Sequence, residues 1–369
     1  MHLSINAEEL RNCLETVEKA LPSRSTMPVI SNVLLEINED QLTFSATNLE
    51  MFIKTRMEYS SEQSGKILLP PKLVDIIRNF PTENVDLKIN WDNYRLDISG
   101  GSANFHLYGS DPEDYPSTFD SATGEGQVIT IDQSILKKML RSVIFAASNE
   151  ETRPAFNGVL FTLKKGSFSL TASDTYRLAI KEIRDNSWSI EERLSLAPAR
   201  SMRELLRLLG EQPVNISINQ ESSIIAFQIE QVFFATRLLE EKFPDVSGVI
   251  PKEYKTRIKV NKKIFEETVS RASLLAEGKN QAVNLIVDED QLEVKVSGQQ
   301  GSMEDLLSAD VEGEQIDVFA NTRFVLDVLK IIDDDNVILD FHGDGGPIIF
   351  RLADDQSYLY LVLPIKKVN

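Results

Sequence analysis

Residues 128–131, 214–218, 223–229 and 232–238 alternate apolar and polar side chains, and polar turns join the last three segments. A period of two is typical of β-strands that bury one face. Similar segments recur in the first and last thirds of the chain. We therefore predict a protein rich in antiparallel strands joined by short turns.

Other segments between these strands repeat their apolar residues with a period near 3.6. Met202, Leu205, Leu206 and Leu209 lie at i, i+3, i+4 and i+7, which places them on one face of a helix. Asp132 is a favourable N-cap for another helix. In all, the pattern predicts helices over residues 7–19, 72–78, 133–141, 199–209, 262–275 and 322–330.

The order of these segments repeats three times. Pro28–Ile53 aligns without a gap on Pro154–Ala179 at an offset of 126, with apolar residues opposite apolar residues along nearly the whole stretch. A third copy shares the four residues Glu289–Leu292 with Glu39–Leu42 at an offset of 250. We therefore predict an α+β chain of three repeated domains, 1–126, 127–253 and 254–369, with antiparallel sheets and helices on one face.

Composition and length fit a globular protein of several domains. The 369 residues are 42% hydrophobic and 26% charged, which argues against long disordered segments. The single cysteine, Cys13, excludes an internal disulfide framework. No apolar run approaches the roughly 20 residues of a membrane span, and residues 1–10 do not have the pattern of a signal peptide. A cytoplasmic location is expected.

The distribution of charge is more informative than its total. With 39 basic and 57 acidic residues the net charge is −18, which argues against nucleic-acid binding when the chain is taken whole. The six predicted helices, however, hold 15 basic and 9 acidic residues, which leaves 24 and 48 for the rest. For any single helix, a solvated face is the simpler interpretation. For six helices together, a shared anionic partner is favoured.

The helix over 199–209 carries the clearest basic pattern. Arg200, Arg203 and Arg207 follow at i, i+3 and i+7, roughly opposite the apolar face. If a sheet covers the apolar face, these arginines are expected on an open surface.

Residues suited to catalysis or metal binding are scarce. His2, His106 and His342 have no partner at a spacing that suits metal binding or acid–base chemistry. Motifs for nucleotide phosphates and for a nucleophilic serine are missing. Residues 343–347 are glycine-rich but lie between two predicted strands, which favours a hairpin turn, and Cys13 falls on an apolar helix face. The sequence therefore predicts no enzyme, no catalytic residue, no metal and no cofactor.

Passages along the whole chain share their order and spacing with one known family. Arg24–Ile30 resembles Arg-x-Thr-Leu-Pro-Ile-Leu, and residues 172–179 resemble Ala-Thr-Asp-x-His/Tyr-Arg-Leu-Ala. Residues 151–159, with Glu-Thr-Arg-Pro and then Asn-Gly-Val, resemble the opening of a second domain in that family. Lys242–Asp245 and Leu363–Lys366 complete the set. The family is the bacterial β sliding clamp (DNA polymerase III subunit beta), the processivity subunit of the replicative DNA polymerase.

The resemblance implies a homodimer whose two chains close head-to-tail into a ring around duplex DNA, with helices lining a central hole. Duplex DNA carries one charge per about 1.7 Å, so a positive lining attracts it without reading bases. The helical charge count makes candidates for phosphate contact of Lys72, Arg78, Lys137, Lys138, Arg141, Arg200, Arg203 and Arg207. The resemblance adds the loop residues Arg24 and Arg153; for Arg153 a structural salt bridge is an equal alternative.

The resemblance also implies a groove between the second and third domains for short hydrophobic motifs of partner proteins. By position it is formed by Phe156, Thr175, Tyr176, Arg177, Leu178, Pro244, Val249, Val362, Leu363, Pro364 and Ile365. Leu178 and Val362 are equally well explained as core, whereas Tyr176 and Arg177 are harder to explain that way. Gly248 stands where some members have arginine, and the chain continues beyond the groove with residues 367–369.

The dimer interface implied by the resemblance joins Phe105 and Leu107, on an edge strand of the first domain, to Leu274 and Leu275 of the third. The alternative is that Phe105 and Leu107 face their own core. Implied partners are duplex DNA, a second copy of the chain, the replicative polymerase, the clamp loader and repair proteins, with no membrane.

Two other functions compete with the clamp. The first is an acidic repeat scaffold that binds proteins only, which would have no reason to enrich basic residues on helices. The second is an enzyme with an unrecognised site, which would need a convergent polar cluster.

Overall fold

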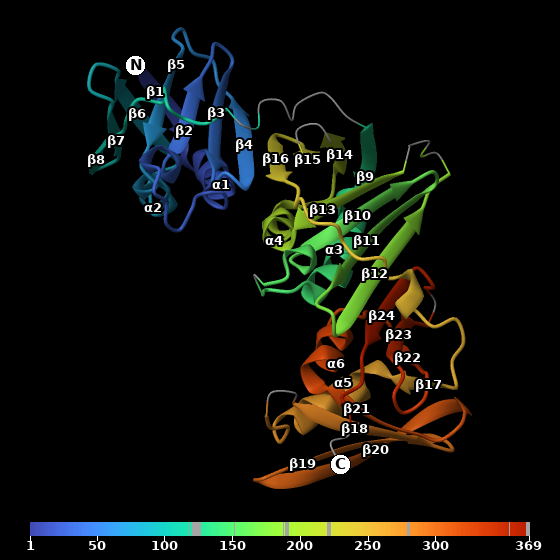
Figure 1. The fold of residues 1–369 in the computed structure, drawn as a ribbon. Coiled ribbons are helices and arrows are strands. Elements are labelled where there is room, and N and C mark those ends of the chain that lie inside the picture. Colours follow the sequence, from blue (N-terminus) through green and yellow to red (C-terminus); the bar gives the residue numbers. More distant parts are fainter. Residues whose placement is uncertain are drawn as a thin grey trace. The chain divides into compact units, whose positions relative to one another are not determined.

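The computed structural model describes residues 1–117, 119, 127–150, 152–186, 188, 192–219, 223–278, 281–353 and 355–366. Its elements confirm the predicted α+β class, and the described strands pair antiparallel. Their order repeats three times: a strand and a helix, four strands and a second helix, and three final strands (Figure 1).

The first repeat contains β1 (His2–Asn6), α1 (Ala7–Glu18), β2 (Val33–Ile37), β3 (Gln41–Thr47), β4 (Met51–Glu58), β5 (Gly65–Leu69), α2 (Lys72–Arg78), β6 (Asn84–Asn90), β7 (Arg95–Gly100) and β8 (Ala103–Tyr108). The second contains β9 (Gln127–Asp132), α3 (Gln133–Val143), β10 (Gly158–Lys164), β11 (Ser167–Ser173), β12 (Arg177–Arg184), β13 (Arg193–Pro198), α4 (Ala199–Leu208), β14 (Pro213–Asn219), β15 (Ile224–Ile229) and β16 (Val232–Arg237). The third contains β17 (Thr256–Asn261), α5 (Lys262–Ser273), β18 (Ala282–Asp288), β19 (Gln291–Gly298), β20 (Gly301–Gly313), β21 (Ile316–Asn321), α6 (Thr322–Leu329), β22 (Asn336–Phe341), β23 (Ile348–Leu352) and β24 (Tyr358–Val362). Short 3₁₀ helices lie at η1 (Pro28–Ser31), η3 (Ile144–Ala146), η4 (Pro154–Phe156) and η5 (Ser247–Val249).

The predicted helices are all present, and each begins at its expected residue and ends within two residues of its expected end. Asparagines fix several of these starts. The side-chain oxygen of Asn6 accepts hydrogen bonds from the amides of Glu8 and Glu9 at 3.0 and 3.1 Å, and Asn261 and Asn321 cap α5 and α6 in the same way. Such caps satisfy amides that the first helical turn leaves without a partner.

The described strands form three sheets, of four, eight and twelve strands. The eight-stranded sheet has the order β5-β2-β3-β4-β16-β15-β14-β9, and at its middle Met51 of β4 lies opposite Thr236 of β16. In the twelve-stranded sheet β12 pairs with β24, and Arg177 lies opposite Val362. The four-stranded sheet, β1-β6-β7-β8, ends at β8. Strands of successive repeats are thus joined edge to edge in two of the sheets.

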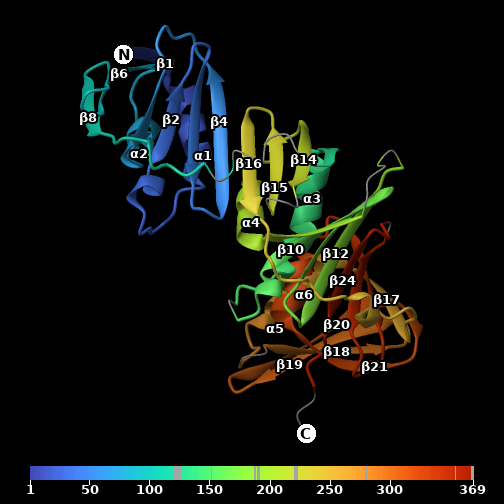
Figure 2. The same cartoon turned by 45° about the horizontal axis from the view of Figure 1, so that its top comes forward.

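The chain divides into two compact units, one of residues 1–136 and 203–238 and the other of residues 137–202 and 239–369. In the first, α1 packs on β3 and β4 through Leu10, Leu14 and Val17, which are fully buried (Figure 1). In the second, α5 packs against α6 (Figure 2). α1, α5 and α6 each pack against strands, with buried apolar residues on one side of the helix, as their sequence period requires.

Two further expectations are confirmed outside the candidate site. Cys13 is buried on α1, and burial raises the pKa of its thiol to about 11. Residues 343–347 form the turn between β22 and β23, where the amide of Gly346 donates to the carbonyl of Gly343 at 3.1 Å. None of the helices in the described ranges has the length and apolar character that a membrane crossing needs.

Candidate nucleic-acid interface and peptide groove

The arginines of α4 form a stripe that is only partly open. Arg200 and Arg207 are exposed, but Arg203 is half-buried, and burial lowers the pKa of its guanidinium. Successive helical residues are rotated by about 100°, so Arg203 lies at the margin of the apolar face beside Met202. Arg207 donates from Nη1 to both carboxylate oxygens of Glu204 at 2.9 and 2.8 Å. The expectation of a fully open stripe was therefore wrong at Arg203.

The basic residues of α3 are more available. Lys138 and Arg141 are exposed, and Lys137 is half-buried. Within the described residues, neither Lys138 nor Arg141 forms an ion pair, and α3 itself contains no acidic residue. These two side chains can contact a phosphate without first breaking an ion pair with a carboxylate.

The basic residues of α2 are exposed but already paired. Lys72 Nζ lies 3.0 Å from Asp75 Oδ2. Arg78 binds Glu15 at 2.9 Å and Glu18 at 2.7 Å, both on α1. Hydrogen bonds to these glutamates raise the pKa of Arg78 above its ordinary value. To contact DNA, Lys72 and Arg78 would have to break these ion pairs and bind phosphates instead.

The two loop arginines differ in their surroundings. Arg24 is exposed between α1 and η1. Arg153 is exposed as well, and its Nη1 donates to Thr175 Oγ1 at 3.0 Å. Among the residues that the structure describes, Arg153 has no salt bridge. The hydrogen bond ties this arginine to one of the candidate groove residues.

Two basic residues outside the predicted candidate list are, like Lys138 and Arg141, exposed and without an ion pair in the described part of the chain. Lys263 of α5 and Lys330 directly after α6 are exposed, and neither forms an ion pair with the described residues. The helical charge count had included both.

A buried apolar cluster lies among the candidate groove residues. Leu178, Leu361 and Ile349 form this cluster, and Val246 and Ile250 pack against it. Three apolar residues close to the cluster in sequence remain accessible: Tyr176 is 60% exposed, Val249 55% and Leu363 44%. The amide of Leu363 donates to the carbonyl of Tyr176 at 2.9 Å, which fixes the chain after β24 against the chain before β12.

Arg177 and Val362 lie on the other face of the sheet, so their assignment to the groove is corrected. They are opposite each other across β12 and β24 and are buried, at 6% and 0% exposure. Side chains alternate between faces along a strand, so neighbours of Leu178 and Leu361 cannot line the same surface as those two residues. Leu361, which the sequence reasoning did not name as a site residue, lies with Leu178 in the buried cluster instead.

Arg177 is fully engaged on that other face. Its guanidinium binds Asp174 at 2.8 Å, Asp327 at 2.6 Å and the carbonyl of Phe145 at 2.7 Å. It also lies 4.5 Å from the centre of the Phe324 ring. This contact set explains Arg177 as a buried structural residue, contrary to the expectation from its sequence context.

The remaining candidate groove residues are placed as follows. Phe156 is half-buried, with its ring 5.8 Å from that of Phe243, and Pro244 is exposed. Thr175 is half-buried with φ of 79°. Pro364 and Ile365 are half-buried, and the amide of Ile365 donates to the carbonyl of Phe319 at 2.7 Å. Residues 367–369 lie outside the described residues.

The candidate interface residues are accessible on their elements. On β8, Phe105 is 42% exposed and Leu107 half-buried. After α5, Leu274 is 82% exposed and Leu275 half-buried.

No group of acidic, histidine and cysteine side chains that could hold a metal ion occurs among the described residues.

Comparison with known proteins gives a consistent result. Family models for the DNA polymerase III beta subunit match the chain in three parts: the N-terminal domain over residues 1–119, the central domain over 130–245 and the C-terminal domain over 247–366. The beta sliding clamp of Halalkalibacterium halodurans is 30% identical over 381 residues, covering 99% of this chain and 100% of the relative.

Solved structures agree with the sequence comparison. The crystal structure of the DNA polymerase sliding clamp from Bacillus subtilis covers 100% of both chains with a TM-score of 0.93 at 28% identity. A sliding clamp from Pseudomonas aeruginosa bound to griselimycin also covers 100% of both chains with a TM-score of 0.93, at 25% identity.

Proposed function

The chain belongs to the DNA polymerase III beta subunits, the beta sliding clamps, and we propose that two copies close head-to-tail into a ring that encircles duplex DNA. The ring tethers the replicative polymerase for processive synthesis and has no catalytic activity of its own. It acts in the cytoplasm, and each copy supplies three domains, 1–126, 127–253 and 254–369.

The proposal rests mainly on the two strand pairings that connect successive repeats, which are called joints below. β4 of the first repeat pairs with β16, the last strand of the second, and β12 of the second pairs with β24, the last strand of the third. By its place in the repeat, β20 corresponds to β4 and β12, and β8 corresponds to β16 and β24. β20 and β8 are therefore the two strands left to form a third joint. β8 is a sheet edge, and residues 301–308 of β20 pair only with β19 in the described structure. A second copy would satisfy both edges by the same rule.

The two existing joints also predict the register of the third. They place Met51 opposite Thr236 and Arg177 opposite Val362. The hairpin β3–β4 has the same register as β19–β20 when 250 is added to its residue numbers. In the same way, β7–β8 has the register of β15–β16 when 129 is added. Leu107 is then expected opposite Gly301 of the second copy, and His106 opposite Ser302. Such a head-to-tail contact, made twice, gives a closed dimer.

The exposed cations of the helices support DNA as the encircled partner. Lys138, Arg141 and Arg200 are accessible on α3 and α4 of a chain whose net charge is −18. Positive charge held by rigid helices attracts phosphates without sequence preference. Lys72, Arg78, Lys137, Arg203, Arg207, Arg24 and Arg153 complete the proposed contact set, with the paired ones contributing less.

The groove would hold short hydrophobic motifs of partner proteins: the polymerase, the clamp loader and repair proteins. Its exposed rim of Tyr176, Val249 and Leu363 stands beside the buried Leu178 and Leu361. An apolar anchor seated there would cover surface that is now in water.

Retention on closed DNA tests this function. The purified protein, loaded on nicked circular DNA, should stay bound at a salt concentration that removes ordinary DNA-binding proteins, and should be lost once the circle is linearised. Equal retention on circular and linear DNA would contradict encirclement, because binding by charge alone does not depend on topology.

A further inference from the structure

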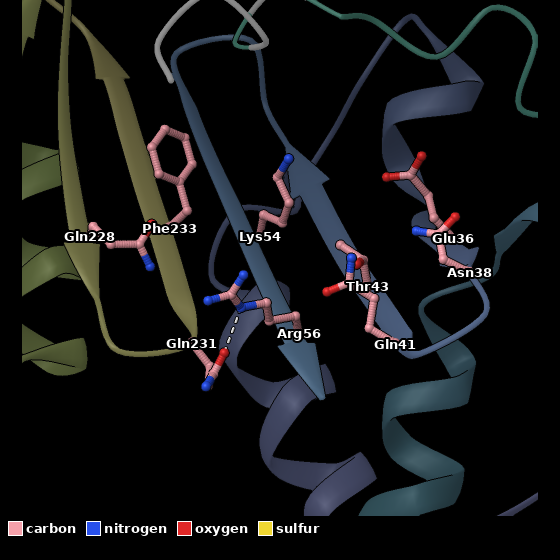
Figure 3. A pocket seen from close by; sticks show the side chains of 9 residues that line it. All are labelled: Glu36, Asn38, Gln41, Thr43, Lys54, Arg56, Gln228, Gln231 and Phe233. Atoms are coloured by element: carbon pink, nitrogen blue, oxygen red, sulfur yellow. Dashed lines mark hydrogen bonds between the residues drawn. The ribbon is translucent and has the colours of Figure 1, made fainter. Parts of the chain in front are cut away.

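A cavity of about 310 Å³ opens on the eight-stranded sheet where β4 meets β16 (Figure 3). On β4, Thr55 faces the buried side, so Lys54 and Arg56 face the opposite one. Phe233 of β16 lies opposite Lys54, and Thr43 of β3 lies opposite Arg56. Side chains of the first and second repeats therefore line one cavity.

The cavity has a surplus of positive charge. Within the described residues, Lys54 and Arg56 have no ion pair. Arg56 Nε donates to Gln231 Oε1 at 2.5 Å, which orients the guanidinium. The acidic lining residue, Glu36, is bound at 2.5 Å by Lys66, which is not part of the lining. Two cations without carboxylate partners in a chain of net charge −18 indicate a place for an external anion.

Amide side chains and one aromatic ring complete the lining. Asn38, Gln41, Gln228 and Gln231 also line the cavity, and the half-buried Phe233 lines it from β16 (Figure 3). The amide of Gln228 already donates to the carbonyls of Glu230 and Val232, so Lys54 and Arg56 are the main donors for a ligand. Two cationic donors suit a compact oxyanion such as phosphate, and the ring offers an apolar face for the rest of a ligand.

We propose that this cavity binds a small phosphate ester, with the phosphate at Lys54 and Arg56 and the organic part against Phe233. The direct joint between β4 and β16 consists of the five residue pairs from Met51↔Thr236 to Thr55↔Val232. A ligand that contacts β3 and β4 on one side and β15 and β16 on the other bridges this joint. Its binding free energy therefore adds to the stability of the joint, and this contribution rises with the logarithm of the ligand concentration once that exceeds Kd.

Titration calorimetry with the full chain tests the site, using inorganic phosphate, adenosine 5′-monophosphate and glutarate as probes. We expect one phosphate site per chain, tighter binding of the nucleotide, and weaker binding of glutarate. Lys54→Gln and Arg56→Gln should each weaken phosphate binding by about tenfold or more, because each removes a charge-assisted hydrogen bond. Lys88→Gln is the matched control, because Lys88 is an exposed lysine on β6, in another sheet and outside the lining. The phosphate affinity of this variant should be unchanged.

Phe233→Ala separates the two parts of the ligand. It should remove the advantage of the nucleotide over inorganic phosphate and leave phosphate binding intact. The proposal fails if phosphate does not bind, or if binding survives both the Lys54 and the Arg56 substitutions in protein whose circular dichroism is native. Glutarate binding as tight as phosphate binding would overturn the choice of ligand class.

Discussion

The guanidinium of Arg177 binds the carboxylate of Asp327 at 2.6 Å and so connects the first residue of β12 in the second repeat to α6 in the third. The neighbouring Leu178 and the paired Leu361 lie on the other face of the sheet, in the buried cluster of the proposed groove. The ion pair therefore supports these two strands from the face opposite to that cluster.

Replacing Arg177 by Met should destabilise the protein by about 3–5 kcal/mol, because Asp174 and Asp327 would keep their charge without a buried partner. Chemical denaturation measures this loss. Arg184→Met is the control: Arg184 lies at the far end of the same strand, is 81% exposed, and among the described residues binds only Glu182. If both variants unfold at the same denaturant concentration, the network around Arg177 has no structural role.

The second prediction compares the contribution to DNA binding of basic residues on α3 with that of basic residues on β10 and β12. Lys138→Gln combined with Arg141→Gln should lower the salt slope of DNA binding by about 1.8, because each lost phosphate contact lowers it by about 0.9. Lys164→Gln combined with Arg184→Gln removes the same charge from β10 and β12 and should leave the slope unchanged. Equal slopes for the two double variants would mean that α3 does not contact DNA. Fluorescence anisotropy at several salt concentrations gives both values.

Local periodicity accounts for what the sequence predicted. The helices were found because their apolar residues recur every three or four positions. The asparagine caps at Asn6 and Asn261 were not used as a signal, although they stand at the helix starts. The hairpin at residues 343–347 followed from glycines between two apolar runs. The family assignment rested on short passages in a fixed order, which the comparisons confirm.

Contacts between residues far apart in the chain account for what could not be predicted from the sequence. Arg78 was taken as free for DNA, but its partners Glu15 and Glu18 lie on a helix about sixty positions earlier in the sequence. Val362 was assigned to the groove by its position in the family resemblance, which does not show which face of β24 each residue takes. The cavity beside Lys54 depends on the pairing of β4 with β16, which has no local sequence signal.

The third prediction concerns the rim of the groove. Leu363→Ala should weaken binding of a hydrophobic partner peptide by roughly 10- to 150-fold, if the side chain is buried on binding and contributes about 1.5–3 kcal/mol. The unfolding midpoint should hardly change, because Leu363 is 44% exposed in the free protein. Leu194→Ala on β13, which removes another exposed leucine, is the control. Leu178, at 3% exposure, is unsuitable for this test because a polar substitution there would unfold the protein.

The last prediction concerns the seam between two copies. If His106 lies opposite Ser302 of a second copy, their Cα atoms are about 4.5–5.5 Å apart, which is within the range of a disulfide. The double variant His106→Cys with Ser302→Cys should therefore form covalent dimers on oxidation, while the native Cys13 stays inert because burial raises its pKa to about 11. Pairing His106→Cys with Glu304→Cys moves the second thiol two residues along β20 and should cross-link poorly. Efficient cross-linking of this control alone would show that the register is shifted by two residues.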